Sequence, residues 1–413
     1  MNTHGETELM APAGSWEALT AACNAGAGSV YFGIEHLNMR SRSSANFTLA
    51  DMPELVSQCR AKGVKAYLTL NTIIYDNDIR LMKKIADAAL ESGIAAIIAS
   101  DHAAIAYCAS RNIPVHISTQ ANITNTETVK FYSAWADAMV LSRELSLTQV
   151  AHIVNEIKRR RIKGPSGRPV RIEVFAHGAL CMAVSGKCYL SLHTNYASAN
   201  RGVCVQNCRR SYIVTDKETG SELEVENENI MSAKDLCTIS FLDKLVEAGI
   251  AILKIEGRGR SADYVHTVTS CYCEALDACK RNEYTAGKVE DWVKRLSTVF
   301  NRGFWDGYYL GRTMGEWHKE YGSKATQKKI FLGTAVKYYP AIGVAHFKLE
   351  NAGMKQGETL LITGKHTGVL DMKADGIRVD GVSYSEAGKG QEVTFCVKKQ
   401  VREGDKLYKL ISA

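Results

Sequence analysis

Short apolar runs alternate with longer segments of helical periodicity over the first 258 residues of the chain. The runs are apolar on both faces, which is typical of buried parallel strands. Several of the segments between them begin at Asp or Ser and end at Gly, which are helix start and stop signals. Eight such units predict a TIM-like (β/α)8 barrel, although a doubly wound open sheet has the same pattern. The expected strands are 8–13, 29–33, 64–70, 95–100, 115–119, 138–142, 171–178 and 251–257.

The pattern changes near residue 329. From there to residue 413, alternating strands are separated by turns that contain Gly, which predicts a small C-terminal all-β barrel or sandwich. A long insertion separates the seventh strand from the eighth. We therefore expect a barrel over 1–320 with a cysteine-bearing insertion at about 180–237, followed by a small β-barrel domain over 329–413.

Length and composition narrow the class of protein. A chain of 413 residues with 46% hydrophobic content is long enough for a large domain and a smaller one. No run approaches the roughly 20 apolar residues that span a bilayer, and the N-terminus lacks the basic and apolar regions of a secretory signal. We expect a cytoplasmic protein with no membrane partner. The net charge of +7 does not identify a nucleic-acid partner by itself.

Five of the twelve cysteines gather in the insertion and at its edges: Cys181, Cys188, Cys204, Cys208 and Cys237. Thiolates are soft metal ligands, and in a reducing compartment such crowding favours a metal or cluster over disulfides. The wide, irregular spacing suits an iron-sulfur cluster better than structural zinc, which usually shows two tight cysteine pairs. Zinc, and thiols that are only reactive or structural, remain alternatives at this stage.

Polar side chains follow the predicted strands where these end, and the strand ends of a (β/α)8 barrel meet at one mouth. His177 and the deeper Glu173 come from the seventh strand and Gln120 follows the fifth, and these three are the candidate catalytic residues. A basic lining of this mouth is consistent with phosphate contacts. The candidate substrate-binding residues are Asn38, Arg40, Asn122, Arg143, Arg209, Arg210, Glu256, Arg258 and Arg260.

The segment EVFAHGALCMAVSGKCYLS resembles the signature of the collagenase-like "U-thirty-two" peptidases, a family of unknown catalytic type. The resemblance covers nearly the whole chain. It implies oxygen-independent hydroxylation supported by an iron-sulfur cluster, with tRNA wobble uridine, a 23S rRNA cytidine or ubiquinone precursors as the substrates of different members. Prephenate is the implied oxygen source of the tRNA reaction. Other matching pieces are MAPAGSWEAL, HISTQANITN, NRGVCVQNCRR, SAKDLCTI, KIEGRGRSADYV and FNRGFWDGY.

Matched motif by motif, the resemblance implies that Cys181, Cys188, Cys204 and Cys237 hold a 4Fe-4S cluster. Cys208 is then an extra thiol or a substitute ligand. The leading functional prediction is prephenate-dependent 5-hydroxylation of tRNA uridine, with tRNA or rRNA as the partner, because CVQNCRR and the appended β-domain resemble the RNA-acting members.

Two other functions stay open. The family name suggests a collagenase-like peptidase, but the sequence has no HExxH helix and no GxSxG elbow, and no activated nucleophile is legible in it. A third hypothesis is an RNA-binding assembly factor that is not an enzyme and whose metal is structural.

Overall fold

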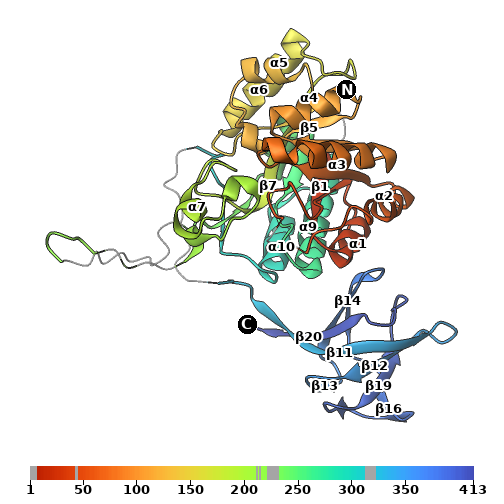
Figure 1. Ribbon diagram of the computed structural model, residues 1–413. Coiled ribbons are helices and arrows are strands. Elements are labelled where there is room, and N and C mark those ends of the chain that lie inside the picture. Colours follow the sequence, from red (N-terminus) through yellow and green to blue (C-terminus); the bar gives the residue numbers. More distant parts are fainter. Residues whose placement is uncertain (1–6, 42–44, 211–212, 214, 221–231, 312–321) are drawn as a thin grey trace.

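The computed structural model describes residues 7–41, 45–210, 213, 215–220, 232–311 and 322–413 (Figure 1). Eight parallel strands form a closed ring, because the last of them, β9, pairs with both β1 and β7. This confirms the TIM-like barrel and excludes a doubly wound sheet, which has two open edges. The ring strands are β1 (Glu8–Ala13), β2 (Ser29–Phe32), β3 (Lys65–Leu70), β4 (Ala96–Ala99), β5 (Val115–Ile117), β6 (Ala138–Val140), β7 (Arg171–Ala179) and β9 (Ile252–Ile255).

Helices surround this ring, and their ends follow from the sequence (Figure 1). Ser146 illustrates this, because it begins its helix with a capping box that it shares with Gln149. The apolar stripe of the same helix, from Val150 to Ile157, is buried against the barrel. The helices are α1 (Trp16–Asn24), α2 (Met52–Ala61), α3 (Ile79–Glu91), α4 (His102–Ser110), α5 (Thr126–Tyr132), α6 (Leu147–Arg160), α8 (Leu242–Glu247), α9 (Ala262–Lys280) and α10 (Ala286–Ser297), with short 3-10 turns η1 (Asp76–Asp78) and η2 (Thr119–Ala121). None of the helices in the described ranges is long and apolar enough to cross a membrane.

The insertion between β7 and β9 leaves the ring and returns to it. β8 (Asp235–Cys237) adds antiparallel to the end of β7, and β10 (Phe304–Trp305) adds parallel to β8. The ring closes without this segment, since β9 pairs directly with β7. The insertion contains α7 (Leu190–Asn195), η3 (Ala199–Arg201) and η4 (Asn207–Arg209). Within the predicted insertion, residues 211–212, 214 and 221–231 lie outside the described residues.

The C-terminal part is antiparallel β-structure, as expected, with its own apolar core that includes the stacked rings of Phe347 and Phe395. The expected end of the barrel at residue 320 lies outside the described residues. The strands are β11 (Gln327–Tyr339), β12 (Val344–Leu349), β13 (Met354–Lys355), β14 (Thr359–Gly364), β15 (Gly368–Lys373), β16 (Arg378–Val379), β17 (Val382–Ser383), β18 (Glu386–Ala387), β19 (Glu392–Cys396) and β20 (Lys406–Ser412).

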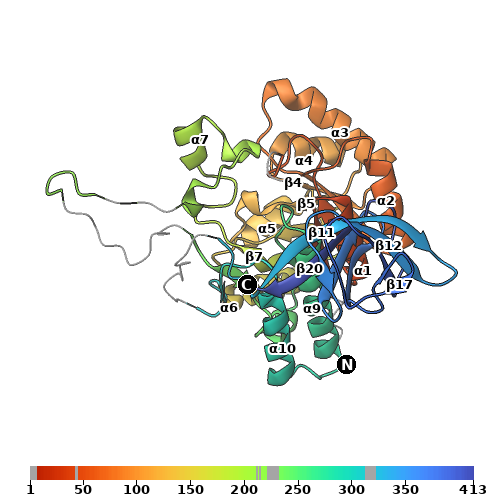
Figure 2. The ribbon, with the colours of Figure 1, turned by 90° about the horizontal axis from the view of Figure 1, so that it is seen from below.

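This β-region packs against the side of the barrel formed by α1 and α9. Ala21 and Ala262 from these helices share a small apolar cluster with Leu361 and Val369. The hydroxyl of Thr20 donates to the carbonyl oxygen of Lys365 over 2.6 Å beside this cluster. Figures 1 and 2 show that the β-region lies well away from α7. The barrel mouth beside α7 is therefore left open by the C-terminal strands.

Candidate active site at the barrel mouth

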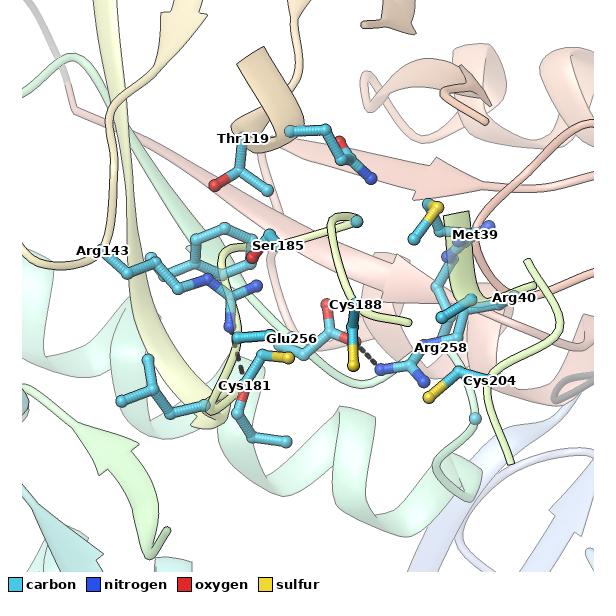
Figure 3. Close-up of a pocket in the computed structure, with 18 of the residues that line it drawn as sticks. Met39, Arg40, Thr119, Arg143, Cys181, Ser185, Cys188, Cys204, Glu256 and Arg258 are labelled. Atoms are coloured by element: carbon cyan, nitrogen blue, oxygen red, sulfur yellow. Dashed lines mark hydrogen bonds and ion pairs between the residues drawn. The ribbon is translucent and has the colours of Figure 1, made fainter. Parts of the chain in front are cut away.

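A cavity of about 530 Å³ opens at the carboxyl ends of the ring strands (Figure 3). Its wall combines residues that follow six of these strands with residues of the insertion, as the geometry of a (β/α)8 barrel predicts. Among the described residues, seven cationic side chains and one carboxylate line it, a formal charge of +6. The predicted site residues on this wall are Arg40, Gln120, Arg143, Arg209, Glu256, Arg258 and Arg260, together with Cys181, Cys188 and Cys204.

Four thiols share the cavity wall: those of Cys181, Cys188, Cys204 and Cys208. Figure 3 shows the first three pointing into the same space beside Glu256. The Cys181 side chain is exposed and the other three are half-buried. Burial raises the pKa of the Cys208 thiol, and the neighbouring Arg209 guanidinium partly opposes that rise.

The insertion is held against the barrel by specific hydrogen bonds. The carbonyl oxygen of Asn200 accepts from the Ile73 amide over 3.2 Å, and its side-chain oxygen accepts from the Cys188 amide, also over 3.2 Å. Arg209 donates to the carbonyl oxygens of Leu180 and Ala233 over 2.6 and 2.8 Å. These bonds fix the segments that carry the four thiols.

Gly202 permits the close approach that brings Cys204 to the barrel. Its φ is +83°, and a Cβ at this position would lie 2.2 Å from the carbonyl oxygen of Asn38. Only glycine combines that backbone conformation with that contact. The backbone conformation and the close contact therefore explain why the NRGVC motif has a glycine at this position.

The structure separates Cys237 from the four thiols on the wall. Cys237 is buried on β8, opposite His177 in the strand register, and its sulfur lies 3.9 Å from the Tyr272 hydroxyl. Burial raises the pKa of this thiol to about 11. Of the ligand set implied by the family motifs, Cys181, Cys188 and Cys204 line the cavity and Cys237 does not, whereas the extra thiol of Cys208 does.

The thiols of this wall suit a group of several metal atoms better than a single metal ion. Within the described ranges, no three His, Cys, Asp or Glu side chains converge closely enough to hold a single metal ion. Thiols that surround a cavity suit a group of several metal atoms, which takes its ligands from different sides. Thiolates are also the donors that iron-sulfur clusters use. The surrounding arginines would compensate the negative charge of such a group.

His177 lies behind the cavity wall rather than on it. A register irregularity between Phe175 and His177, where β7 pairs with β9, breaks the inward and outward alternation of the strand. The imidazole packs against Tyr264, Tyr272 and Phe304 instead. Burial, and secondarily the charge of Arg260, lowers its pKa to about 3, so the ring is neutral. The position therefore does not support the predicted catalytic role.

Glu256 is the carboxylate of the cavity wall and is already paired. Its Oε1 lies 2.9 Å from Nη2 of Arg40, and its Oε2 accepts a hydrogen bond from the Tyr31 hydroxyl over 3.1 Å. Burial alone would raise its pKa, but the charges of Arg40, Arg143 and Arg258 outweigh that effect and lower the pKa to about 2. Glu256 therefore stays ionised and orients arginines rather than acting as a proton acceptor.

The Arg258 side chain is buried, and two hydrogen bonds beneath the cavity wall fix its orientation. Its Nη1 donates to Asn38 Oδ1 over 2.9 Å and to Thr69 Oγ1 over 2.8 Å. Burial lowers its pKa to about 10, which leaves it charged at neutral pH. Asn38, a predicted substrate-binding residue, is thus a positioning residue beneath the wall.

Glu173 is buried beneath the cavity and forms an ion pair with Lys254, whose Nζ lies 2.8 Å from Oε1. Burial alone would raise the pKa of Glu173, but the Lys254 charge lowers it to about 2. Lys254 also lines the cavity. The sequence prediction missed this lysine, although a lysine within the apolar strand ILKI was a visible signal.

Arg143 has an unfilled hydrogen-bonding site. Its Nη1 donates to the Ala179 carbonyl oxygen over 3.0 Å, but its Nε is buried and has no hydrogen-bond partner within the described part of the chain. A buried unsatisfied donor is costly unless a ligand completes it. Arg143 nevertheless lines the cavity, where its guanidinium can meet an anion.

Of the four remaining predicted residues, two lie on the cavity wall and two do not. Gln120 lies on the wall, and its Oε1 accepts from Asn71 over 3.4 Å. Arg260 stacks on the Phe300 ring at 3.5 Å. Asn122 bonds to the Ser142 hydroxyl and Arg210 is exposed, and neither lines the cavity. Wall residues that the prediction missed include Tyr31, Phe175, Lys254 and Arg302.

Among the described residues, the cavity wall lacks an imidazole base. No histidine is among the described residues that line it, so none of its thiols has an imidazole base on the wall. Its carboxylate is occupied by Arg40. The cationic side chains of the wall suit an anion, and its thiols suit a metal group.

Comparison with known proteins agrees with this geometry. The model of "Peptidase family U32" matches residues 14–319. A protein of Porphyromonas gingivalis named collagenase is 54% identical over 97% of each chain. A tRNA hydroxylation protein of Bacillus subtilis is 32% identical over 80% of this chain and 77% of its own. A 23S rRNA 5-hydroxycytidine synthase of Escherichia coli is 33% identical over 75% of this chain but only 46% of its own.

Among solved structures, a U32 peptidase covers 62% of this chain and 96% of its own, at 12% identity and a TM-score of 0.40. The family model covers most of the barrel and the residues that carry all four thiols of the cavity, and the collagenase-named relative aligns over 97% of the chain. The resemblance expected from the sequence is confirmed, and the chain belongs to peptidase family U32.

Proposed function

We propose that this protein is an RNA hydroxylase that takes a base of a tRNA into the cavity at the barrel mouth. The observation that carries the proposal is the juxtaposition of four thiols with a cavity wall of formal charge +6. Relatives at 32 to 33% identity that are named for tRNA hydroxylation and for synthesis of 5-hydroxycytidine in 23S rRNA support it. The proposal keeps the cytosolic location expected from the sequence.

A 4Fe-4S cluster is the cofactor that we propose for this site, held by Cys181, Cys188, Cys204 and Cys208. This set replaces the one implied by the family motifs, because Cys208 lines the cavity and Cys237 is buried elsewhere. When bound, the cluster would supply one-electron transfer next to the substrate. The protein would provide charge compensation through Arg209 and Arg302, which lie on the same wall.

The arginines of the wall fit an anionic co-substrate as well as an RNA phosphate. Insertion of oxygen into a C–H bond removes two electrons from the base, so an oxygen donor or a separate acceptor must take up the same two electrons. Prephenate, a dicarboxylate, is the oxygen source that we propose. Arg143, with its unpaired Nε, and Arg258 are placed to receive carboxylates. Gln120 offers an amide to the edge of a base.

The proposal is tested in two steps. Protein purified without oxygen should be brown and contain about four irons per chain. Nucleoside analysis of tRNA from a deletion strain of the host should then lack 5-hydroxyuridine derivatives, which should return with the wild-type gene. Unchanged tRNA and rRNA in the deletion strain would refute RNA hydroxylation.

Peptide hydrolysis is the second candidate, because relatives at 54 and 48% identity are named collagenase. The cavity provides no imidazole to activate a thiol or a water within the described residues. We therefore expect a protease-free sample to leave gelatin intact. Cleavage that is lost in Cys188→Ser but kept in the distant Cys396→Ser would establish the hydrolase instead.

A further inference from the structure

We propose that three exposed tyrosines beside the cavity form a stacking surface for unpaired bases, so that the substrate is recognised as a single-stranded RNA segment. We call Tyr75, Tyr189 and Tyr196 the rim tyrosines. The inference rests on the proposed function in one respect, since it takes RNA as the substrate. It adds the structural form of that RNA and the surface that binds it.

The rim tyrosines expose large aromatic surfaces that the fold does not use. Tyr75 is 57% exposed, Tyr189 is 69% exposed and Tyr196 is 94% exposed. Burial of such rings is the usual outcome in a folded protein, so three of them in one region indicate a binding surface.

Their position follows from the cavity wall. Tyr189 comes directly after the wall residue Cys188, and Tyr196 ends α7, which begins at the wall residue Leu190. Six helical residues extend about 9 Å. The two rings therefore lie within reach of bases that neighbour the one in the cavity.

Tyr75 is fixed to the same rim by Asn200. The Asn200 carbonyl oxygen accepts from the Ile73 amide and its side chain accepts from the Cys188 amide, so the loops that carry Tyr75 and Tyr189 are bonded to one residue. The Arg201 guanidinium lies 4.1 Å from the centre of the Tyr75 ring and is paired with Asp78. One face of Tyr75 is thus backed by a cation, and the other is available for stacking.

Tyr196 has an unusual backbone conformation for a bulky residue. Its φ of +51° and ψ of +29° lie in the left-handed region, which Asn and Gly adopt more readily. Its ring gains almost no burial in return, since it is 94% exposed. A strained residue that displays an aromatic ring to solvent points to a ligand outside the chain.

Charge favours a nucleic acid over a protein as that ligand. The segment 174–215 contains no Asp or Glu, and its cations are Lys187, Arg201, Arg209 and Arg210. Lys187, two residues before Tyr189, is exposed and suits a phosphate group. Aromatic rings interleaved with cations are the usual surface for single-stranded nucleic acid, whose bases have free faces, whereas bases in a duplex are already stacked.

The test uses the full chain, isolated without oxygen with whatever metal it carries. Fluorescence anisotropy measures binding of a fluorescein-labelled oligouridine and of a blunt RNA duplex of equal length. The oligouridine should bind more tightly than the duplex. Tyr196→Asn keeps the left-handed backbone without the ring, and Tyr189→Ser removes the second ring. Each should weaken oligouridine binding about tenfold, and Tyr196→Phe should bind like the wild type.

Two further measurements separate stacking from a general loss of structure. Tyr384 is 52% exposed in the C-terminal β-region, and Tyr384→Ala should bind oligouridine normally. In Tyr196→Trp, the indole fluorescence should be quenched by oligouridine and unchanged by the duplex.

The outcomes distinguish this inference from the proposed function. If the rim variants bind and hydroxylate RNA like the wild type, or if Tyr384→Ala loses as much affinity as they do, the stacking surface is refuted while RNA hydroxylation stands. If the wild type prefers the duplex, the single-stranded substrate is refuted. If it binds neither RNA and instead binds gelatin through the rim tyrosines, both the inference and the proposed function are wrong.

Discussion

The guanidinium carbon of Arg143 lies 3.8 Å from the centre of the Phe175 ring. This stacking holds the flat cation against the cavity wall, and the hydrogen bond to Ala179 holds one of its ends. Arg143 also lines the cavity. The pair therefore fixes in advance the direction from which an anion would approach.

We expect Arg143→Leu to weaken the binding of prephenate about ten- to a hundredfold, since a hydrogen bond to a charged group contributes roughly 1.5–3 kcal/mol. Arg143→Lys should lose a similar amount, because an ammonium lacks the planar fork that stacks on Phe175. Isothermal titration calorimetry measures the dissociation constants. Arg160→Leu is the matched control, since this arginine pairs with Glu127 on the outer surface. Equal affinity in Arg143→Leu and Arg160→Leu would remove Arg143 from the binding site.

The proposed ligand set exchanges the roles that the family motifs implied for two cysteines. Cys208→Ser should lose most of its iron and its visible absorption, because Cys208 lines the cavity with the other three thiols. Cys237→Ser should keep both, because Cys237 is buried beside Tyr272. Iron analysis and absorption spectra of anaerobic samples decide the matter. The reverse result would restore the set implied by the family motifs.

The buried pair of Glu173 and Lys254 predicts a pH-dependent loss of stability. Glu173→Gln leaves the Lys254 charge buried without its partner, which costs about 3–5 kcal/mol at neutral pH. In the wild type, the folded pKa of about 2 lies below the ordinary value of 4.5, so the carboxylate stabilises the fold above pH 4.5 and loses this effect as the pH falls toward 2. The difference in stability between wild type and variant should therefore shrink over that interval.

Urea unfolding followed by circular dichroism at a series of pH values measures this difference. Glu127→Gln on the exposed surface serves as the control and should change stability little at any pH. A gap between wild type and Glu173→Gln that stayed constant from pH 7 to pH 2 would contradict the role of the ion pair.

The packing of the β-region on α1 is tested by two glycines with similar backbones. Gly368 has a φ of +69°, and an added Cβ would lie 3.0 Å from the Ala21 amide nitrogen, whereas Gly376 has a φ of +65° and open space around it. Both substitutions to Ala carry a left-handed strain of about 1–2 kcal/mol. Only Gly368→Ala also disturbs the contact between the two regions. Its melting temperature should fall below that of Gly376→Ala, and equal melting temperatures would mean that this contact contributes little.

The barrel could be predicted because its signal is local and repeated. Strands that are buried on both faces contain almost only apolar residues, and each of the eight expected runs overlaps a ring strand. The closure of the ring could not be read from the pattern, because β9 returns to β7 across the long insertion that contains β8. The C-terminal strands could be predicted because apolar and polar residues alternate along them.

The site was predicted less well where side-chain direction mattered. The strand-end rule correctly brought Arg40, Arg143 and Arg258 to one wall. It failed for His177, because the irregularity in β7 turns that residue toward α9 and no sequence signal marks it. The motif match chose Cys237 and left Cys208 as an extra thiol, whereas their positions relative to the cavity depend on how the insertion folds back on the barrel.

The direct pairing of β7 with β9 has a consequence for how the protein is assembled. Every ring strand finds both of its neighbours without any residue of the insertion, so the ladder of backbone hydrogen bonds is complete before any thiol meets a metal. The ring therefore does not depend on the proposed cluster to complete its backbone pairing, and we expect the apoprotein to keep the barrel. Loading of the proposed cluster would then be separate from folding of the scaffold.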